Sequence, residues 1–175
     1  MANRSYLYST DTVPDDKNNP ERVLCISEHN WAIPLAHRLL VGRGTRVVPS
    51  MIWNPRIGIA ADYDGGTALL LDLLAVVGRG LEDDKEFATC VAKTTGHLEK
   101  QRAKHFVLET GEIISLGDED LDDSLAVVVE SDIPKAVAQA EAAIAGENEA
   151  WLASVRADWQ ENFASFYSDA LYFSF

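Results

Sequence analysis

The chain has almost no basic residues in its C-terminal third. Residues 109–175 contain two bases, Lys135 and Arg156, against 15 acidic residues, which gives a net charge of 2 − 15 = −13. Residues 1–108 contain 13 residues of each sign, so the whole excess charge lies in residues 109–175. The electrostatic field of this concentrated negative charge repels nucleic acid and anionic membranes and attracts basic surfaces. We therefore expect a basic protein partner, no nucleic-acid or membrane binding, and one acidic patch on the folded surface.

Cysteines and long apolar runs are also scarce. The two cysteines, Cys25 and Cys90, lie far apart in apolar stretches, which is typical of reduced thiols rather than of a disulfide framework. The densest apolar run, 68–77, is interrupted by Asp72 and is too short to span a bilayer. The N-terminus lacks the apolar core of a signal peptide. These features predict a soluble, cytoplasmic protein.

Motifs for catalysis or for cofactor binding are missing or incomplete. The four histidines are too dispersed for a metal site, and no zincin, hydrolase or dinucleotide motif occurs. Val-Gly-Arg-Gly at 41–44 and 77–80 follows apolar helical stretches, which favours helix C-caps over phosphate loops. The stretch 62–66 lacks the distal glutamate of a calcium loop, and Cys25 and His29 are separated by a predicted strand end. We expect no catalytic residue, metal or cofactor.

The hydrophobic pattern predicts a mixture of strands and helices. Period-two alternation predicts strands at 4–9, 23–27, 46–53, 57–61 and 171–175, and a hairpin at 105–116 around Thr110-Gly111. Helical spacing predicts helices at 34–40, 67–77, 84–100, 133–146 and 148–165, and leaves 125–129 open as strand or helix. Asp84 or a neighbour can cap the third helix, and Asp132 can begin the fourth. The fourth and fifth helices each carry an apolar stripe, at Ile133, Val137, Ala140 and Ile144, and at Leu152, Val155, Trp159, Phe163 and Phe166. This order of strands and helices favours one α+β domain over 1–175, with a mixed or antiparallel sheet, about five flanking helices and paired terminal strands.

Five carboxylates crowd into six positions, at Asp118, Glu119, Asp120, Asp122 and Asp123. Their mutual repulsion is unfavourable unless they are hydrated, bind a cation or meet a basic partner. A hydrated loop that caps the next element is the simpler interpretation, and a partner-binding site is the functional one. Trp151, beside Glu149 at a predicted helix start, is the candidate exposed anchor, whereas Trp159 fits an apolar helix stripe.

Several stretches carry a family resemblance. The opening Met-Ala-Asn-Arg-Ser-Tyr-Leu-Tyr-Ser, together with stretches 33–36, 46–50, 105–113 and 168–175, is similar to a family of mostly bacterial proteins of unknown function. The resemblance touches both ends and the middle of the chain, so it implies that the family covers the whole domain. It implies no catalytic or binding residue.

These observations leave three functional hypotheses. The leading one is a non-enzymatic protein-binding module, in its most concrete form an immunity-type inhibitor that covers a basic toxin or nuclease. The second is an enzyme or small-ligand binder, with a pocket formed by dispersed residues, namely Arg43, Arg46 and Arg56 with Tyr6, Tyr63 or His37. The third is a scaffold or a homo-oligomer subunit, which an exposed sheet edge or aromatic patch would support.

Overall fold

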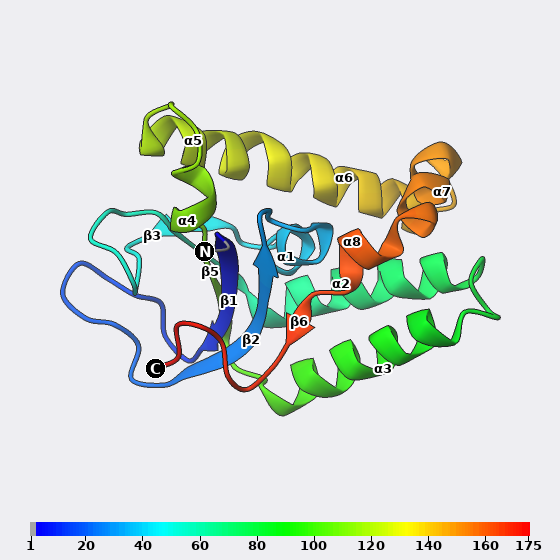
Figure 1. Cartoon of the computed structure of the whole chain (residues 1–175), viewed down its shortest axis with the longest axis horizontal. Coiled ribbons are helices and arrows are strands. Elements are labelled where there is room, and N and C mark those ends of the chain that lie inside the picture. Colours follow the sequence, from blue (N-terminus) through cyan, green and yellow to red (C-terminus); the bar gives the residue numbers. More distant parts are fainter. Residues whose placement is uncertain (1–2) are drawn as a thin grey trace.

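The computed structural model describes residues 3–175, and a six-stranded sheet occupies one half of it, to the left in Figure 1. The strands are β1 (Arg4–Thr10), β2 (Val23–Asn30), β3 (Arg46–Val48), β4 (Gly58–Asp62), β5 (His105–Glu109) and β6 (Phe166–Tyr167), in the spatial order β3-β4-β5-β1-β2-β6. All neighbouring strands are antiparallel. The expected α+β class is therefore confirmed. Met1 and Ala2, which begin the family-like opening, lie outside the described residues.

Side-chain alternation along β1 gives the sheet two buried faces. Tyr6 and Tyr8 point to one face and Ser5 and Leu7 to the other, as the period-two pattern predicts, and all four are fully buried. Helices cover the Leu7 face. The opposite face is covered by loop 49–57 and by the C-terminal segment, residues 168–175.

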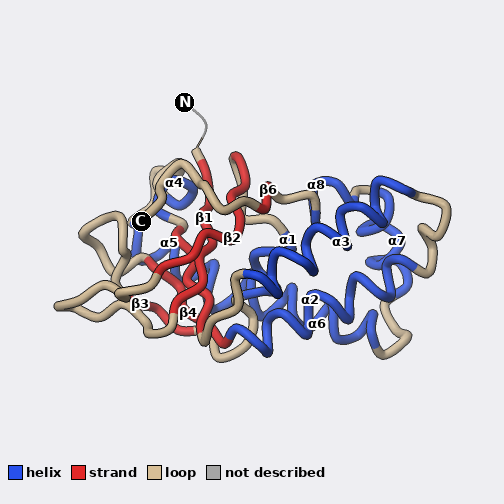
Figure 2. The backbone as a smooth tube through the Cα atoms, turned by 90° about the horizontal axis from the view of Figure 1, so that it is seen from below, coloured by secondary structure: helices blue, strands red, loops and turns tan. Residues whose placement is uncertain are grey.

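The helices form a layer that extends beyond one end of the sheet (Figure 2). Its centre is α2 (Tyr63–Gly78), which contacts α1 (Leu35–Leu40), α3 (Lys85–Lys100), α6 (Ile133–Ile144) and α7 (Glu149–Ala157). Leucines and valines around most of the α2 circumference are buried, as its sequence predicts. The predicted cap of α3 is also confirmed, because the Asp84 carboxylate accepts a hydrogen bond from the Phe87 amide at 2.9 Å.

The hairpin expected at 105–116 is wrong. β5 is followed by the short helix α4 (Gly111–Ile114) instead of a second strand. A tight hairpin turn at Thr110-Gly111 needs a positive φ, and Gly111 does not have one. This glycine serves a close approach instead, because a Cβ atom there would lie 2.7 Å from Cε3 of Trp53.

A single helical segment runs from α5 (Leu121–Val127) through a π-helical turn (Val128–Asp132) into α6. Residues 125–129, left open by the sequence, are therefore helical, and Asp132 does not begin a helix as expected. Pro134 explains the π-helical turn, because proline lacks an N–H and its ring crowds the carbonyl one turn earlier. The wider turn before Pro134 accommodates both effects.

The helix expected at 148–165 is divided at Asp158 into α7 and α8 (Trp159–Phe163). Its apolar stripe is buried as predicted at Leu152, Val155, Trp159 and Phe163. Phe166 departs from the stripe, because the chain leaves the helix at Ala164 and enters β6, where Phe166 is 53% exposed.

The C-terminal strand expected at 171–175 does not form, so it does not pair with β1. The Ser174 hydroxyl accepts from the Leu171 amide and donates to the Leu171 carbonyl, which closes a local turn. β1 pairs with β2 and β5, and the C-terminal segment contacts β1 through side chains.

Candidate functional site

The five clustered carboxylates lie in the loop between α4 and α5 and in the first turn of α5. All five are exposed, and no ion pair within residues 3–175 involves any of them. Asp120 caps α5, because its side chain accepts a hydrogen bond from the Asp122 amide at 2.8 Å. The capping role expected for this stretch is confirmed.

Apolar groups lie next to these carboxylates. Leu116 and Val127 are both 52% exposed, which is high for large aliphatic side chains. A hollow of about 190 Å³ lies at Leu121, between two of the carboxylates; Trp53, Pro55 and Ile57 make most of the rest of its lining apolar, and Glu112 and Ser115 add polar groups. We call this combination the α5 surface; it consists of Leu116, the five carboxylates, Val127 and the hollow.

Several other acids of the C-terminal third are buried or paired with bases, whereas Glu112 lines the hollow. Glu109 is fully buried, Glu141 pairs with Arg43, and Asp169 pairs with Lys100. The expectation of one acidic patch is therefore wrong. Bases from the first two thirds of the chain neutralise part of the charge, whereas the cluster at 118–123 has no ion-pair partner among the described residues.

Trp151 is not close to this cluster. It lies on α7, beyond the far end of the helical segment 121–144, which is roughly 35 Å long at the rise of an α-helix. Its ring is half-buried against the helical core. Trp31 is the exposed tryptophan instead, with 60% of its surface accessible. Nothing in the sequence around Trp31 indicated that it, rather than Trp151, would be the exposed tryptophan.

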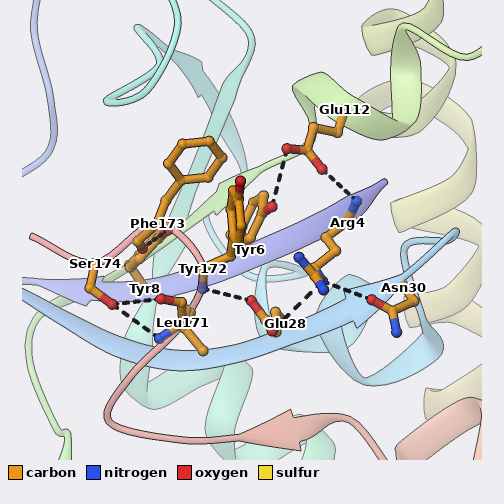
Figure 3. A network of polar contacts seen from close by, with 10 residues as sticks. All are labelled: Arg4, Tyr6, Tyr8, Glu28, Asn30, Glu112, Leu171, Tyr172, Phe173 and Ser174. Carbon is orange, nitrogen blue, oxygen red and sulfur yellow. Dashed lines mark hydrogen bonds and ion pairs between the residues drawn. The ribbon is translucent and has the colours of Figure 1, made fainter. Parts of the chain in front are cut away.

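A network of polar contacts fastens the C-terminal segment and α4 to β1 (Figure 3). The Tyr8 hydroxyl donates to the Phe173 carbonyl at 2.6 Å. The Glu112 carboxylate accepts from the Arg4 amide at 2.8 Å and from the Tyr6 hydroxyl at 3.1 Å. Burial is the main reason why the pKa of Tyr6 is raised to about 12, so this phenol stays a neutral donor. The network stabilises the fold and places α4 beside the α5 surface.

Glu109 holds the loop that forms one wall of the hollow. Its carboxylate accepts hydrogen bonds from the Ser50 hydroxyl at 2.6 Å and from the Met51 amide at 2.7 Å. The Ser50 oxygen in turn accepts from the amides of Ile52 and Trp53. Burial raises the pKa of Glu109, and the two hydrogen bonds to its carboxylate oppose that shift.

The raised pKa of Glu109 predicts a pH-dependent stability that Glu109→Gln removes. Because the folded state binds the proton more tightly than the unfolded state, protonation favours folding. The unfolding free energy of the wild type relative to the variant should be highest below pH 4.5. It should then fall as the pH rises through the folded-state pKa. Urea denaturation across this range measures the difference, and a flat difference would contradict the assignment.

His37 is fully buried, and both of its ring nitrogens form hydrogen bonds with buried serines. Its Nε2 lies 2.9 Å from the Ser27 hydroxyl and its Nδ1 lies 3.1 Å from the Ser5 hydroxyl. Ser5 donates to the Ala32 carbonyl, so it accepts from Nδ1–H, and Ser27 donates to Nε2. Burial lowers the pKa of His37 to about 3, which keeps the ring neutral. The Ser–His contacts therefore serve the interior packing between α1 and the sheet.

The dispersed residues of the second hypothesis do not converge. Arg43 pairs with Glu141 and Arg56 pairs with Asp16, both at the surface. Tyr63 is buried, and its hydroxyl donates to the Leu98 carbonyl. Arg46 is exposed on β3, whereas Tyr6 and His37 lie on opposite faces of the sheet. The structure brings no two of these groups together around a shared hollow.

The motifs set aside in the sequence have structural roles. The amides of Gly42 and Gly80 donate to carbonyls of α1 and α2, which confirms the predicted C-caps. A β-bulge between β1 and β2 places Cys25 opposite Tyr8 and His29 opposite Ser5, on different faces of the sheet. Within residues 3–175, no three His, Cys, Asp or Glu residues are grouped to hold a metal, and no helix is long and apolar enough to cross a membrane.

An antiparallel sheet covered by helices on one face defines the chain as an α+β protein. Within that class it belongs to the family described as a domain of unknown function, DUF7822, which matches residues 11–151. The match includes the α5 surface, whereas the opening motif and the C-terminal segment lie outside it. No curated protein and no solved structure matches the chain.

Proposed function

We propose that the protein is a binding module that docks a basic protein partner on the α5 surface. One observation carries the proposal: five exposed carboxylates without an ion-pair partner in the described chain flank Leu121, which lines an apolar hollow, and exposed Leu116 and Val127 belong to the same segment. Protein interfaces combine an apolar centre with a charged rim in this way. The partner would insert an apolar side chain into the hollow and surround it with lysine and arginine.

Charge complementarity supports the choice of a basic partner. The net charge of −13 attracts a cationic protein over long distances, and the cluster at 118–123 fixes where it docks. An immunity-type inhibitor of a basic toxin or nuclease is the most concrete form of this function. Such an inhibitor acts by covering the basic surface of its target, and it needs no catalytic residue of its own.

A matched pair of charge variants tests the proposal. The first variant neutralises the cluster with Asp118→Asn, Glu119→Gln, Asp120→Asn, Asp122→Asn and Asp123→Asn. The control neutralises five exposed acids at the opposite end of the helical layer with Glu82→Gln, Asp83→Asn, Glu86→Gln, Glu147→Gln and Glu149→Gln. Both variants have a net charge of −13 + 5 = −8, so they differ only in where charge is lost. Asn at position 120 keeps the cap of α5.

Binding is measured by fluorescence anisotropy with a labelled ten-residue peptide of lysine and leucine. Because each exposed charge pair contributes a few tenths of a kcal/mol, the cluster variant should bind about 10- to 100-fold more weakly. The control should bind within about 3-fold of the wild type, because its carboxylates lie away from the hollow. Equal weakening of both variants would show that only net charge matters, and it would contradict the proposal.

A further inference from the structure

Trp31 has a backbone conformation that bulky residues rarely adopt. It follows β2 with φ at +67°, in the left-handed region. Trp31 is 60% exposed, so packing of its side chain does not compensate for this conformation. Glycine would adopt it without strain. The fold alone therefore gives no reason for a tryptophan at this position, and strained residues of this kind are concentrated at functional sites.

A groove of about 560 Å³ lies beside Trp31, between the end of β2 and the connection from α8 to β6. Trp31 and Phe166 are its aromatic walls, and Phe166 is 53% exposed. Polar groups from three elements complete the lining, including Arg4, Glu28, His29 and Glu161. The groove does not share residues with the α5 surface.

The charges that line the groove leave one carboxylate free. Arg4 already has partners within the protein. Its Nε donates a hydrogen bond to Oδ1 of Asn30 at 2.8 Å and lies 3.7 Å from the Glu28 carboxylate. Burial lowers the pKa of His29, so the ring is neutral near pH 7. Glu161 is exposed and forms no ion pair within residues 3–175. A cation is therefore the ligand that the groove favours.

The edge of β2 shows how a chain could enter the groove. β6 pairs only with Ser27 and Glu28, so Asn30 has a strand neighbour on the β1 side but none on the β6 side among the described residues. An extended peptide can pair with such an open edge. The groove is also larger than a single side chain, which leaves room for the peptide backbone.

We propose that this groove binds an arginine or lysine side chain of an extended peptide, with the cation over the Trp31 ring and paired with Glu161. Tryptophan is the side chain that binds cations best through its ring face. Neighbouring aromatic rings already do so within the chain. The Arg4 guanidinium lies 5.3 Å from the centre of the Tyr172 ring, and Lys93 Nζ lies 5.7 Å from that of Phe166. This inference does not depend on the proposed function.

The test uses the whole protein and three probes of defined chemistry. They are acetyl-Gly-Arg-Gly-amide, the same peptide with citrulline in place of arginine, and N-acetylarginine amide. The indole N–H signal of Trp31 in ¹H–¹⁵N spectra should shift saturably with the arginine peptide. Citrulline keeps the shape but lacks the charge, so it should bind about 10-fold more weakly. If the citrulline peptide binds as tightly as the arginine peptide, the groove does not select a cation. If N-acetylarginine amide binds as tightly, the groove does not recognise the peptide backbone.

Two variants and one control localise the binding. Trp31→Gly removes the ring and suits the backbone, so the variant should fold while the shift of the Asn30 amide on titration is lost. Glu161→Gln should weaken binding of the arginine peptide about 5-fold. Glu82→Gln, an exposed position outside both the groove and the α5 surface, changes the net charge equally and should bind like the wild type. Unchanged binding by Trp31→Gly, with its thermal unfolding still cooperative, would overturn the site.

Discussion

Replacing Gly66 with alanine should lower the unfolding free energy by at least about 4 kcal/mol, and this change can prevent folding altogether. Gly66 lies in the first turns of α2, where α1 crosses it. A Cβ atom at Gly66 would lie 1.9 Å from the carbonyl oxygen of Leu40 and 2.7 Å from its carbonyl carbon. Both atoms belong to the backbone, so no side-chain rotation relieves the overlap. The two helices would have to separate, and the core beneath them would open.

Gly96→Ala is the matched control for this substitution. Gly96 lies on the exposed side of α3, and nothing is within 4 Å of a Cβ atom built there. Alanine should therefore stabilise the protein by about 0.5–1 kcal/mol, because glycine loses more conformational freedom in a helix. Urea denaturation followed by circular dichroism measures both values. A Gly66→Ala protein as stable as the wild type would contradict the packing of α1 on α2.

Phe173→Ala should lower the unfolding free energy by about 2–3 kcal/mol, because a ring packed against the sheet is removed. The Phe173 ring meets those of Tyr6 and Trp53 edge-on, with centroid separations of 5.3 and 5.7 Å. Its carbonyl also accepts the hydrogen bond from Tyr8, which the variant keeps. The contact with Trp53 connects the C-terminal segment to the loop that forms the hollow, so loosening of both should accompany the loss of stability.

Tyr172→Ala is the control for Phe173→Ala. Tyr172 is 62% exposed, and the hydrogen bond that its backbone amide donates to the Glu28 carboxylate does not depend on the side chain. Its replacement removes only surface contacts with Arg4 and with the Phe173 ring, so it should lower the unfolding free energy by less than about 1 kcal/mol. Thermal unfolding of both variants provides the comparison. If Phe173→Ala has as little effect as Tyr172→Ala, the C-terminal segment does not pack on β1 as described.

The sequence predicted those elements whose pattern is local. The alternation in β1, the Asp84 cap of α3 and the apolar stripe of α6 all describe interactions within one element, and the structure confirms them. The predictions are wrong where contacts between residues far apart in the sequence determine the local structure. Gly111 looks like a turn residue until Trp53 packs against it, and the strand-like pattern at 171–175 reflects packing on β1 without strand pairing.

The candidate sites divide in the same way. The carboxylates at 118–123 are adjacent in the sequence and were predicted as a cluster. The hollow beside them was not, because Trp53 and Leu121 are far apart in the chain and meet only after folding. Trp31 was missed because its left-handed φ and its exposure have no signal in the sequence.

A titration of ¹⁵N-labelled protein with the lysine–leucine peptide tests the central claim most directly. If the α5 surface docks basic partners, the largest shifts should fall on the amides of 115–127 and on the indole N–H of Trp53, which lines the hollow. The same peptide with serine in place of leucine should shift the Trp53 indole less. Shifts concentrated around 82–86 and 147–149, or spread evenly over all acidic regions, would contradict the claim.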